Sequence, residues 1–137
     1  MRMPSFYRSL IVVLLLALLG SCNDESKKNT LKGIWTVADV KTEFDENKVN
    51  PGTLEQVAEL EKQTVLHFEN DTLLVLSVGD SKFNAFYTYD AASSKIFFSF
   101  DAKGVNMNEL GVLRNDTIFA DSETPVGKIR VFYSRSN

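Results

Sequence analysis

Few residues of this chain have the chemistry of a catalytic or metal-binding site. The 137-residue sequence holds one cysteine, Cys22, and one histidine, His67. A metal site built on several Cys or His ligands is therefore excluded, and so is a disulfide within the chain. His67 stands between Leu66 and Phe68, so in a strand it points to the face opposite these apolar neighbours. An outward or hydrogen-bonded histidine is a simpler interpretation than a catalytic one.

Carboxylates are more numerous, but their positions do not indicate a reaction. Glu43, Asp45 and Glu46 form one group, and Asp121 and Glu123 form another. Both groups fall at the ends of predicted strands, where solvated charges are common, and the sequence has no Asp-x-Asn-x-Asp-Gly calcium loop. Because no base, nucleophile or metal cluster is evident, the sequence predicts a protein that is not an enzyme and that uses neither metal nor cofactor.

Cys22 is explained by the segment that precedes it. Two arginines flank the start of an uninterrupted apolar run from Leu10 to Leu19, and Gly20 and Ser21 are small enough for a peptidase cleft. The run is shorter than the roughly 20 residues that a membrane-spanning helix needs. These are the parts of an export signal, which we predict for residues 1–21.

Leu19-Gly20-Ser21-Cys22 resembles the lipobox of bacterial lipoproteins. This resemblance implies cleavage after Ser21, a thioether from Cys22 to diacylglycerol, and further acyl chains such as palmitate that anchor the protein durably in a membrane. Residues 22–30 are polar throughout and are expected to form a tether, so that the folded domain covers residues 31–137.

The tether carries a second resemblance. Asp24 and Glu25 resemble the acidic signal that sends one group of Gram-negative lipoproteins to the outer face of the outer membrane. The resemblance implies an outer-membrane lipoprotein exposed at the cell surface. An ordinary solvated linker is the alternative, because acidic residues are common in linkers.

Charge and length limit the remaining possibilities. The formal net charge is −3, and it becomes more negative once the signal is removed, because the signal carries Arg2 and Arg8 and no acidic residue. Nucleic acid is therefore not an expected partner. The mature chain has room for one small domain with its own core.

Strand patterns dominate this domain. In Lys95–Asp101, for example, Ile96, Phe98 and Phe100 alternate with Phe97 and Ser99. Most connections have two to five polar residues, which permits antiparallel hairpins but not parallel crossovers. The eight expected strands are Gly33–Lys41, Thr64–Glu69, Thr72–Val78, Asn84–Asp90, Lys95–Asp101, Leu110–Asn115, Thr117–Asp121 and Gly127–Ser134.

One helix is expected between the first two strands. Pro51 and Gly52 predict a turn, and Thr53 is the expected N-cap with Gln56 as its capping-box partner. The helix should cover residues 53–63. Its narrow apolar stripe indicates a helix across the end or flank of a barrel, as a structural plug or as a lid.

Eight short antiparallel strands hide their edges in a barrel or in a sandwich. Leu31-Lys32-Gly33-Ile34-Trp35 resembles the Gly-x-Trp signature on the first strand of lipocalin-like barrels. The resemblance covers residues 31–135 and implies an all-β, eight-stranded, up-and-down barrel. It also implies that Trp35 plugs the closed end and that Arg135, or otherwise Arg130, packs on it. The chain departs from true lipocalins at Tyr87-Thr88-Tyr89-Asp90, which is not their Thr-Asp-Tyr motif, and in the position of its helix.

Two functions are compatible with such a barrel, since eight strands enclose either packed side chains or one small ligand. In the first, the lumen binds a small hydrophobic molecule in the cell envelope, and tyrosine hydroxyls orient it. In the second, the barrel is filled and an envelope protein binds to outer loops such as Thr42–Val49 and Ala102–Glu109. The residues expected to line the lumen in the first case are Leu74, Leu76, Tyr87, Tyr89, Phe98, Phe100, Val131 and Tyr133.

A short repeat, Asn-Asp-Thr-aliphatic, occurs twice, at Asn70–Leu73 and at Asn115–Ile118. Asn and Asp accept hydrogen bonds from their own backbone and tolerate positive φ, so both copies predict tight turns. Thr72 and Thr117 also resemble O-glycan acceptor sites in some exported proteins of the same bacterial group.

Overall fold

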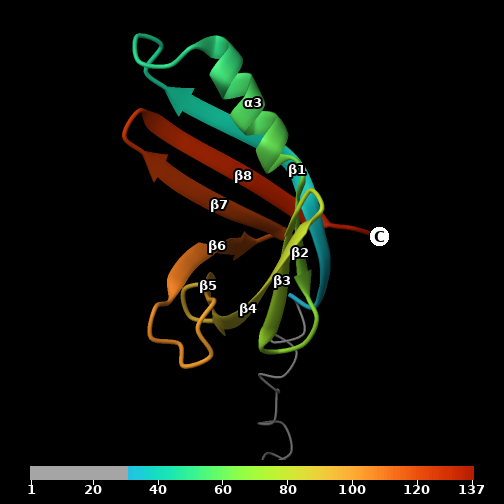
Figure 1. Ribbon diagram of the computed structural model, residues 1–137. Helices are drawn as coiled ribbons and strands as arrows, with labels where there is room; N and C mark the ends of the chain where they lie inside the picture. Colours follow the sequence, from blue (N-terminus) through green and yellow to red (C-terminus); the bar gives the residue numbers. More distant parts are fainter. Residues whose placement is uncertain (1–30) are drawn as a thin grey trace, which may run out of the picture.

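Eight strands follow one another around a closed antiparallel barrel in the computed structural model, which describes residues 31–137 (Figure 1). Each strand pairs with its sequence neighbours, and β8 closes the ring on β1. This confirms the predicted all-β, up-and-down barrel with one short helix between the first two strands. The predicted signal, the lipidation site Cys22 and the tether lie outside the described residues. The elements in order are β1 Gly33–Phe44, α3 Pro51–Glu61, β2 Thr64–Phe68, β3 Leu73–Val78, β4 Ser81–Asp90, β5 Lys95–Ser99, β6 Asn108–Arg114, β7 Thr117–Thr124 and β8 Gly127–Arg135.

The helix begins earlier than predicted. Asn50 is the N-cap, and its side-chain oxygen accepts a hydrogen bond from the Gly52 N–H at 2.9 Å. Pro51 occupies the first turn, where its fixed φ suits the helix and its missing N–H costs no hydrogen bond. The prediction of Thr53 as N-cap is therefore wrong: Asn is a strong cap itself, and Pro51-Gly52 opens the helix instead of forming a turn before it.

The two copies of the Asn-Asp-Thr repeat form turns of different kinds. Between β6 and β7, Asn115 and Asp116 have φ of 50° and 56°, as a two-residue type I′ hairpin requires. Between β2 and β3, the Asn70 side-chain oxygen instead accepts hydrogen bonds from the N–H groups of Thr72 and Leu73, at 2.9 and 2.8 Å. Identical residues thus close one turn through backbone conformation and the other through a side chain.

The barrel is uneven along its axis. β1 and β8 pair over most of their length, with a register shift between Val37 and Asp39 that bends β1. Before that bulge Trp35 and Val37 contact the core, and beyond it Val40 and Phe44 do so. In Figure 1 the far part of β1, with β7, β8 and α3, forms an upper part of the molecule, and β2 to β6 form a lower part.

Residues 31–137 contain no helix that is both long and apolar enough to cross a membrane.

Candidate functional site

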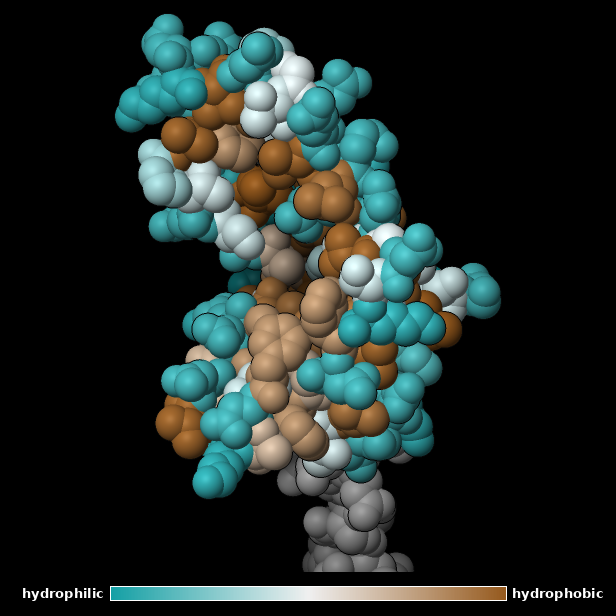
Figure 2. Space-filling model, in the orientation of Figure 1, coloured by the Kyte–Doolittle hydropathy of each residue, from teal (hydrophilic) through white to brown (hydrophobic). Residues whose placement is uncertain are grey.

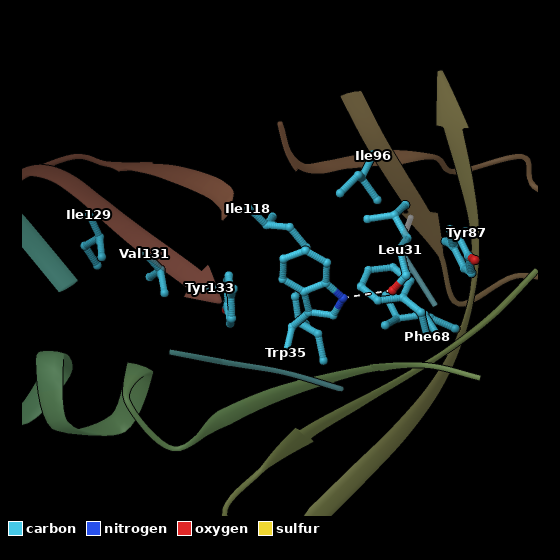
Figure 3. Packing of buried hydrophobic residues seen from close by; sticks show 12 residues of the cluster. Leu31, Trp35, Phe68, Tyr87, Ile96, Ile118, Ile129, Val131 and Tyr133 are labelled. Carbon is cyan, nitrogen blue, oxygen red and sulfur yellow. Dashed lines mark hydrogen bonds between the residues drawn. The ribbon is translucent and has the colours of Figure 1, made fainter. Parts of the chain in front are cut away.

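Trp35 and Arg135 close one end of the barrel. Trp35 is 0% exposed, and its indole N–H donates a hydrogen bond to the Leu31 carbonyl at 2.8 Å (Figure 3). Arg135 is the Cα partner of Trp35 across the β1–β8 ladder, and its guanidinium lies 4.5 Å from the centre of the indole ring. The guanidinium also donates to the Lys32 carbonyl at 2.9 Å. The contact between guanidinium and indole and the hydrogen bond to the backbone thus hold the start of the domain against its last strand.

Arg130, the alternative partner for Trp35, lies elsewhere. It is on the outer face of β8 and forms a two-pronged ion pair with Asp121 of β7, at 2.6 and 2.8 Å. This pair holds the pKa of the Asp121 carboxyl below its ordinary value.

Packed side chains fill the barrel interior near this end. Figure 3 shows Trp35, Phe68, Ile96 and Ile118 facing one another from different strands. The Phe68 ring meets Tyr87 edge to face, with ring centres 4.8 Å apart. Residues that are at most 1% exposed in this cluster are Leu31, Trp35, Leu66, Phe68, Leu74, Ala85, Ile96 and Ile118.

Four of the residues predicted to line a ligand pocket lie within this packed core: Leu74, Tyr87, Val131 and Tyr133. The Tyr87 hydroxyl donates to the Asn70 carbonyl, so a protein group already occupies it. Burial, with the nearby charge of Asp71, raises the pKa of Tyr87 to about 12. Burial and the Glu61 carboxylate also raise the pKa of Tyr133, and a hydrogen bond with Thr64 opposes them only in part.

Of the other four, Leu76, Phe98 and Phe100 lie in the halves of their strands away from the Trp35 end, whereas Tyr89 pairs with Ile96 close to the connection between β4 and β5. Leu76, Tyr89 and Phe98 are half-buried, and they pack against the core from its side. Phe100 is 60% exposed, so its placement as a lining residue of a closed lumen is a correction to the prediction. β5 ends at Ser99, one residue before it. Its ring still meets Phe98 edge to face, with 5.6 Å between ring centres.

Phe83 joins these residues and was not predicted. It is the Cα partner of Leu76 and shares the inner face of β4 with Ala85 and Tyr87, yet it is 49% exposed. The predicted strand began at Asn84, one residue too late to include it. The alternation Phe83, Ala85, Tyr87, Tyr89 was the signal that would have placed it. We define the rim cluster as Leu76, Phe83, Phe98 and Phe100.

The surface of the molecule has several hollows. Figure 2 shows a notch between the upper and lower parts of the molecule, with apolar side chains at its floor and over the lower part. Three concavities have other linings. One, of about 520 Å³, lies outside the barrel along β6, β7 and β8, and another, of about 540 Å³, follows α3 at Glu55, Glu59 and Leu60. A small one of about 70 Å³ is lined by Lys41, Glu43, Lys128 and Arg130. The predicted ligand-binding residues line none of these three.

The structure also places His67 and the two acidic groups. His67 lies on the outer face of β2, half-buried, with its Nδ1 atom 3.8 Å from the Glu69 carboxylate. Within residues 31–137, no three or more His, Cys, Asp or Glu side chains are grouped so that they could hold a metal ion. Of the two acidic groups, Asp121 is paired with Arg130 and Lys128, and Asp45 with Lys48.

Comparisons with protein-family models, with curated proteins and with solved structures find no match to this chain. The barrel and its surface therefore carry the functional argument alone.

Proposed function

We propose that this protein is a lipoprotein of the bacterial cell envelope, lipidated on Cys22, and that its lipocalin-like barrel is a non-catalytic binding module for a small hydrophobic ligand. The rim cluster is the proposed binding surface. The ligand rests on this rim and does not enter a deep lumen.

Exposure of inner-face rings is the observation that supports this proposal. Inner positions of a barrel are normally filled, and full burial of a phenylalanine contributes about 1.5–3 kcal/mol. Phe83 lies on that face but is 49% exposed, and Phe100, just past the end of β5 and in contact with the Phe98 ring, is 60% exposed. A ligand seated on them recovers apolar burial that the fold itself leaves unused.

The depth of the barrel limits the ligand. Trp35, Phe68 and Leu74 occupy the interior below the rim, and each is fully buried. A ligand therefore contacts the rings of the rim cluster. It is no larger than one flat ring system or one hydrocarbon chain. Tyr87 is the Cα partner of Phe98, but its hydroxyl already donates to the Asn70 carbonyl, so apolar contact with the rings supplies the affinity.

Binding of hydrophobic fluorophores and of a fluorescent fatty acid tests the proposal. Phe83→Ser and Phe100→Ser should each weaken saturable binding about tenfold or more, since each removes a ring from the contact. Phe86→Ser is the matched control, because Phe86 is 42% exposed but lies on the outer face of β4. Equal losses in all three variants, or no saturable binding by the wild type, would refute a rim site.

A different observation supports a second function, the binding of another envelope protein. The connection between β5 and β6 carries Val105 and Met107, which are 73% and 37% exposed. Exposed apolar residues on a long loop are suited to contact with another envelope protein. A photo-crosslinking residue at Val105 should capture a partner in the host cell if this function holds, while one at Lys82 in β4 should not.

A further inference from the structure

The barrel is joined weakly between β6 and β7. These strands pair at three positions only, Val112↔Phe119, Leu113↔Ile118 and Arg114↔Thr117. β7 continues to Thr124 and pairs with β8 along its whole length. β6 instead bends away at a bulge beside Leu110 and follows β5. Residues 120–124 of β7 are therefore paired with β8 on one side and with no strand on the other.

Hydrogen-bond alternation shows which groups this leaves free. Thr124 and Gly127 close a two-residue hairpin, and the residues of such a closing pair exchange backbone hydrogen bonds. Because hydrogen-bonded pairs alternate along an antiparallel ladder, Thr124, Ser122 and Ala120 bond to β8. The intervening residues, Asp121 and Glu123, direct their N–H and C=O groups to the side that β6 has left. Within the described chain, no backbone hydrogen bond to these two residues is found outside the strand ladders.

Gly111 is the point at which the strands separate. A Cβ atom there would lie 2.4 Å from the Phe119 carbonyl oxygen, so only glycine allows β6 to cross β7 this closely. Past this crossing lies the concavity of about 520 Å³. Its lining joins both separated strands and the outer face of β8: Glu109, Leu110, Gly111, Val112, Arg114, Phe119, Asp121, Glu123, Lys128 and Arg130.

We propose that this groove is a peptide-binding site in which an extended segment of another protein adds a strand to the free edge of β7. The backbones of Asp121 and Glu123 each offer one N–H donor and one C=O acceptor. The backbone of an extended peptide can pair with these groups. Side chains of β7 alternate, so the added segment must alternate too: apolar on the face of Ala120, which packs against the core, and polar on the opposite face, beside Asp121 and Glu123.

Charge favours a basic segment over a second copy of this chain. Two β7 edges joined around a twofold axis at Ser122 would place Asp121 opposite the other copy's Glu123, and like charges directly opposite are destabilising. Lys128 and Arg130 already neutralise Asp121, whereas Glu123 makes no ion pair among the described residues. A lysine or arginine opposite Glu123 therefore gains a cross-strand partner.

Amide hydrogen exchange of the free protein tests the edge. The Asp121 and Glu123 amides should exchange rapidly, while those of Ser122 and Thr124, bonded to β8, should exchange slowly. Equal protection of all four amides would mean that the edge is already covered, and it would overturn the proposal.

Peptide binding tests the occupant. The probes are a blocked peptide of alternating lysine and valine, its glutamate–valine counterpart, and the lysine peptide with a central proline. The lysine peptide should bind saturably and protect the Asp121 and Glu123 amides, while the other two bind more weakly. Glu123→Lys should lower affinity for the lysine peptide about fivefold and raise it for the glutamate peptide, and Glu55→Lys on α3 should change neither. No binding of the lysine peptide, or equal binding to the wild type and to Glu123→Lys, would overturn the proposal. Neither result depends on the rim cluster.

Discussion

Arg135 stacks over Trp35 across the β1–β8 ladder, with its guanidinium 4.5 Å from the centre of the ring. The contact joins the first strand to the last, so it fastens together the two strands at which the barrel closes. Trp35 in turn reaches Leu31 through its indole N–H, which ties the start of the described chain to the core.

Truncation of Trp35 should therefore be among the most costly changes. Trp35→Ala leaves a large cavity at a fully buried site, and we expect a loss of about 3–5 kcal/mol in the free energy of unfolding, measured by urea denaturation. Arg135→Ala should cost about 1 kcal/mol, because it removes the stacking and the bond to the Lys32 carbonyl. Lys82→Ala, at an exposed position of β4, is the control and should change stability by less than about 0.5 kcal/mol. A Trp35→Ala protein as stable as the control would contradict the closure of this end.

The repeated Asn-Asp-Thr turns should respond in opposite ways to one substitution. Asn70→Gly removes a side-chain oxygen that accepts two backbone hydrogen bonds, so it should destabilise the fold by about 1–2 kcal/mol. Asn115→Gly relieves a residue with φ of 50° and should stabilise the fold by up to about 1 kcal/mol. Thermal unfolding of both variants gives the comparison. Equal shifts of the same sign would show that the two turns do not differ as described.

Alternation of apolar residues predicted the strands and the inward-facing positions of Leu74, Val131 and Tyr133, and the short polar connections predicted the antiparallel order. It reports which face a residue occupies, but it does not report how far along the barrel axis that residue lies. Phe98 and Phe100 share one face, yet one is half-buried at the core and the other extends beyond the end of β5. Their difference depends on the register between strands and on where β5 ends, and both are tertiary properties.

The separation of β6 from β7 was beyond sequence reasoning for a similar reason. Gly111 and Leu110 read as an ordinary strand, and only the pairing shows that the bulge beside Leu110 and the close crossing at Gly111 end the ladder early. The cap at Asn50, in contrast, was readable from an Asn-Pro pair, whose two residues suit the N-cap and the first helical position.

The anchor requires its own experiment. If Cys22 is lipidated, Cys22→Ala should abolish labelling by a fatty-acid probe and release the domain from the membrane fraction, or leave it unprocessed. Because the predicted site precedes the barrel, the purified domain of the variant should unfold at the same temperature as the wild-type domain. Continued labelling of the Cys22→Ala protein would exclude this residue as the lipid site.

Alkaline pH should destabilise the barrel through its buried tyrosines. Burial and Asp71 raise the pKa of Tyr87 from 10.0 to about 12, so the folded state holds the phenolic proton more tightly than the unfolded state does. The resulting stability is fully present below about pH 10 and is lost as the pH rises toward 12; Tyr133, whose pKa is also raised by burial, acts in the same direction.

Urea denaturation at several pH values should show a steeper alkaline decline for the wild type than for Tyr87→Phe, which lacks the titrating group. The Phe variant loses the bond to the Asn70 carbonyl and should start about 1 kcal/mol lower at neutral pH. Parallel declines for the two proteins would show that the Tyr87 phenol titrates alike in the folded and unfolded states, contrary to its burial.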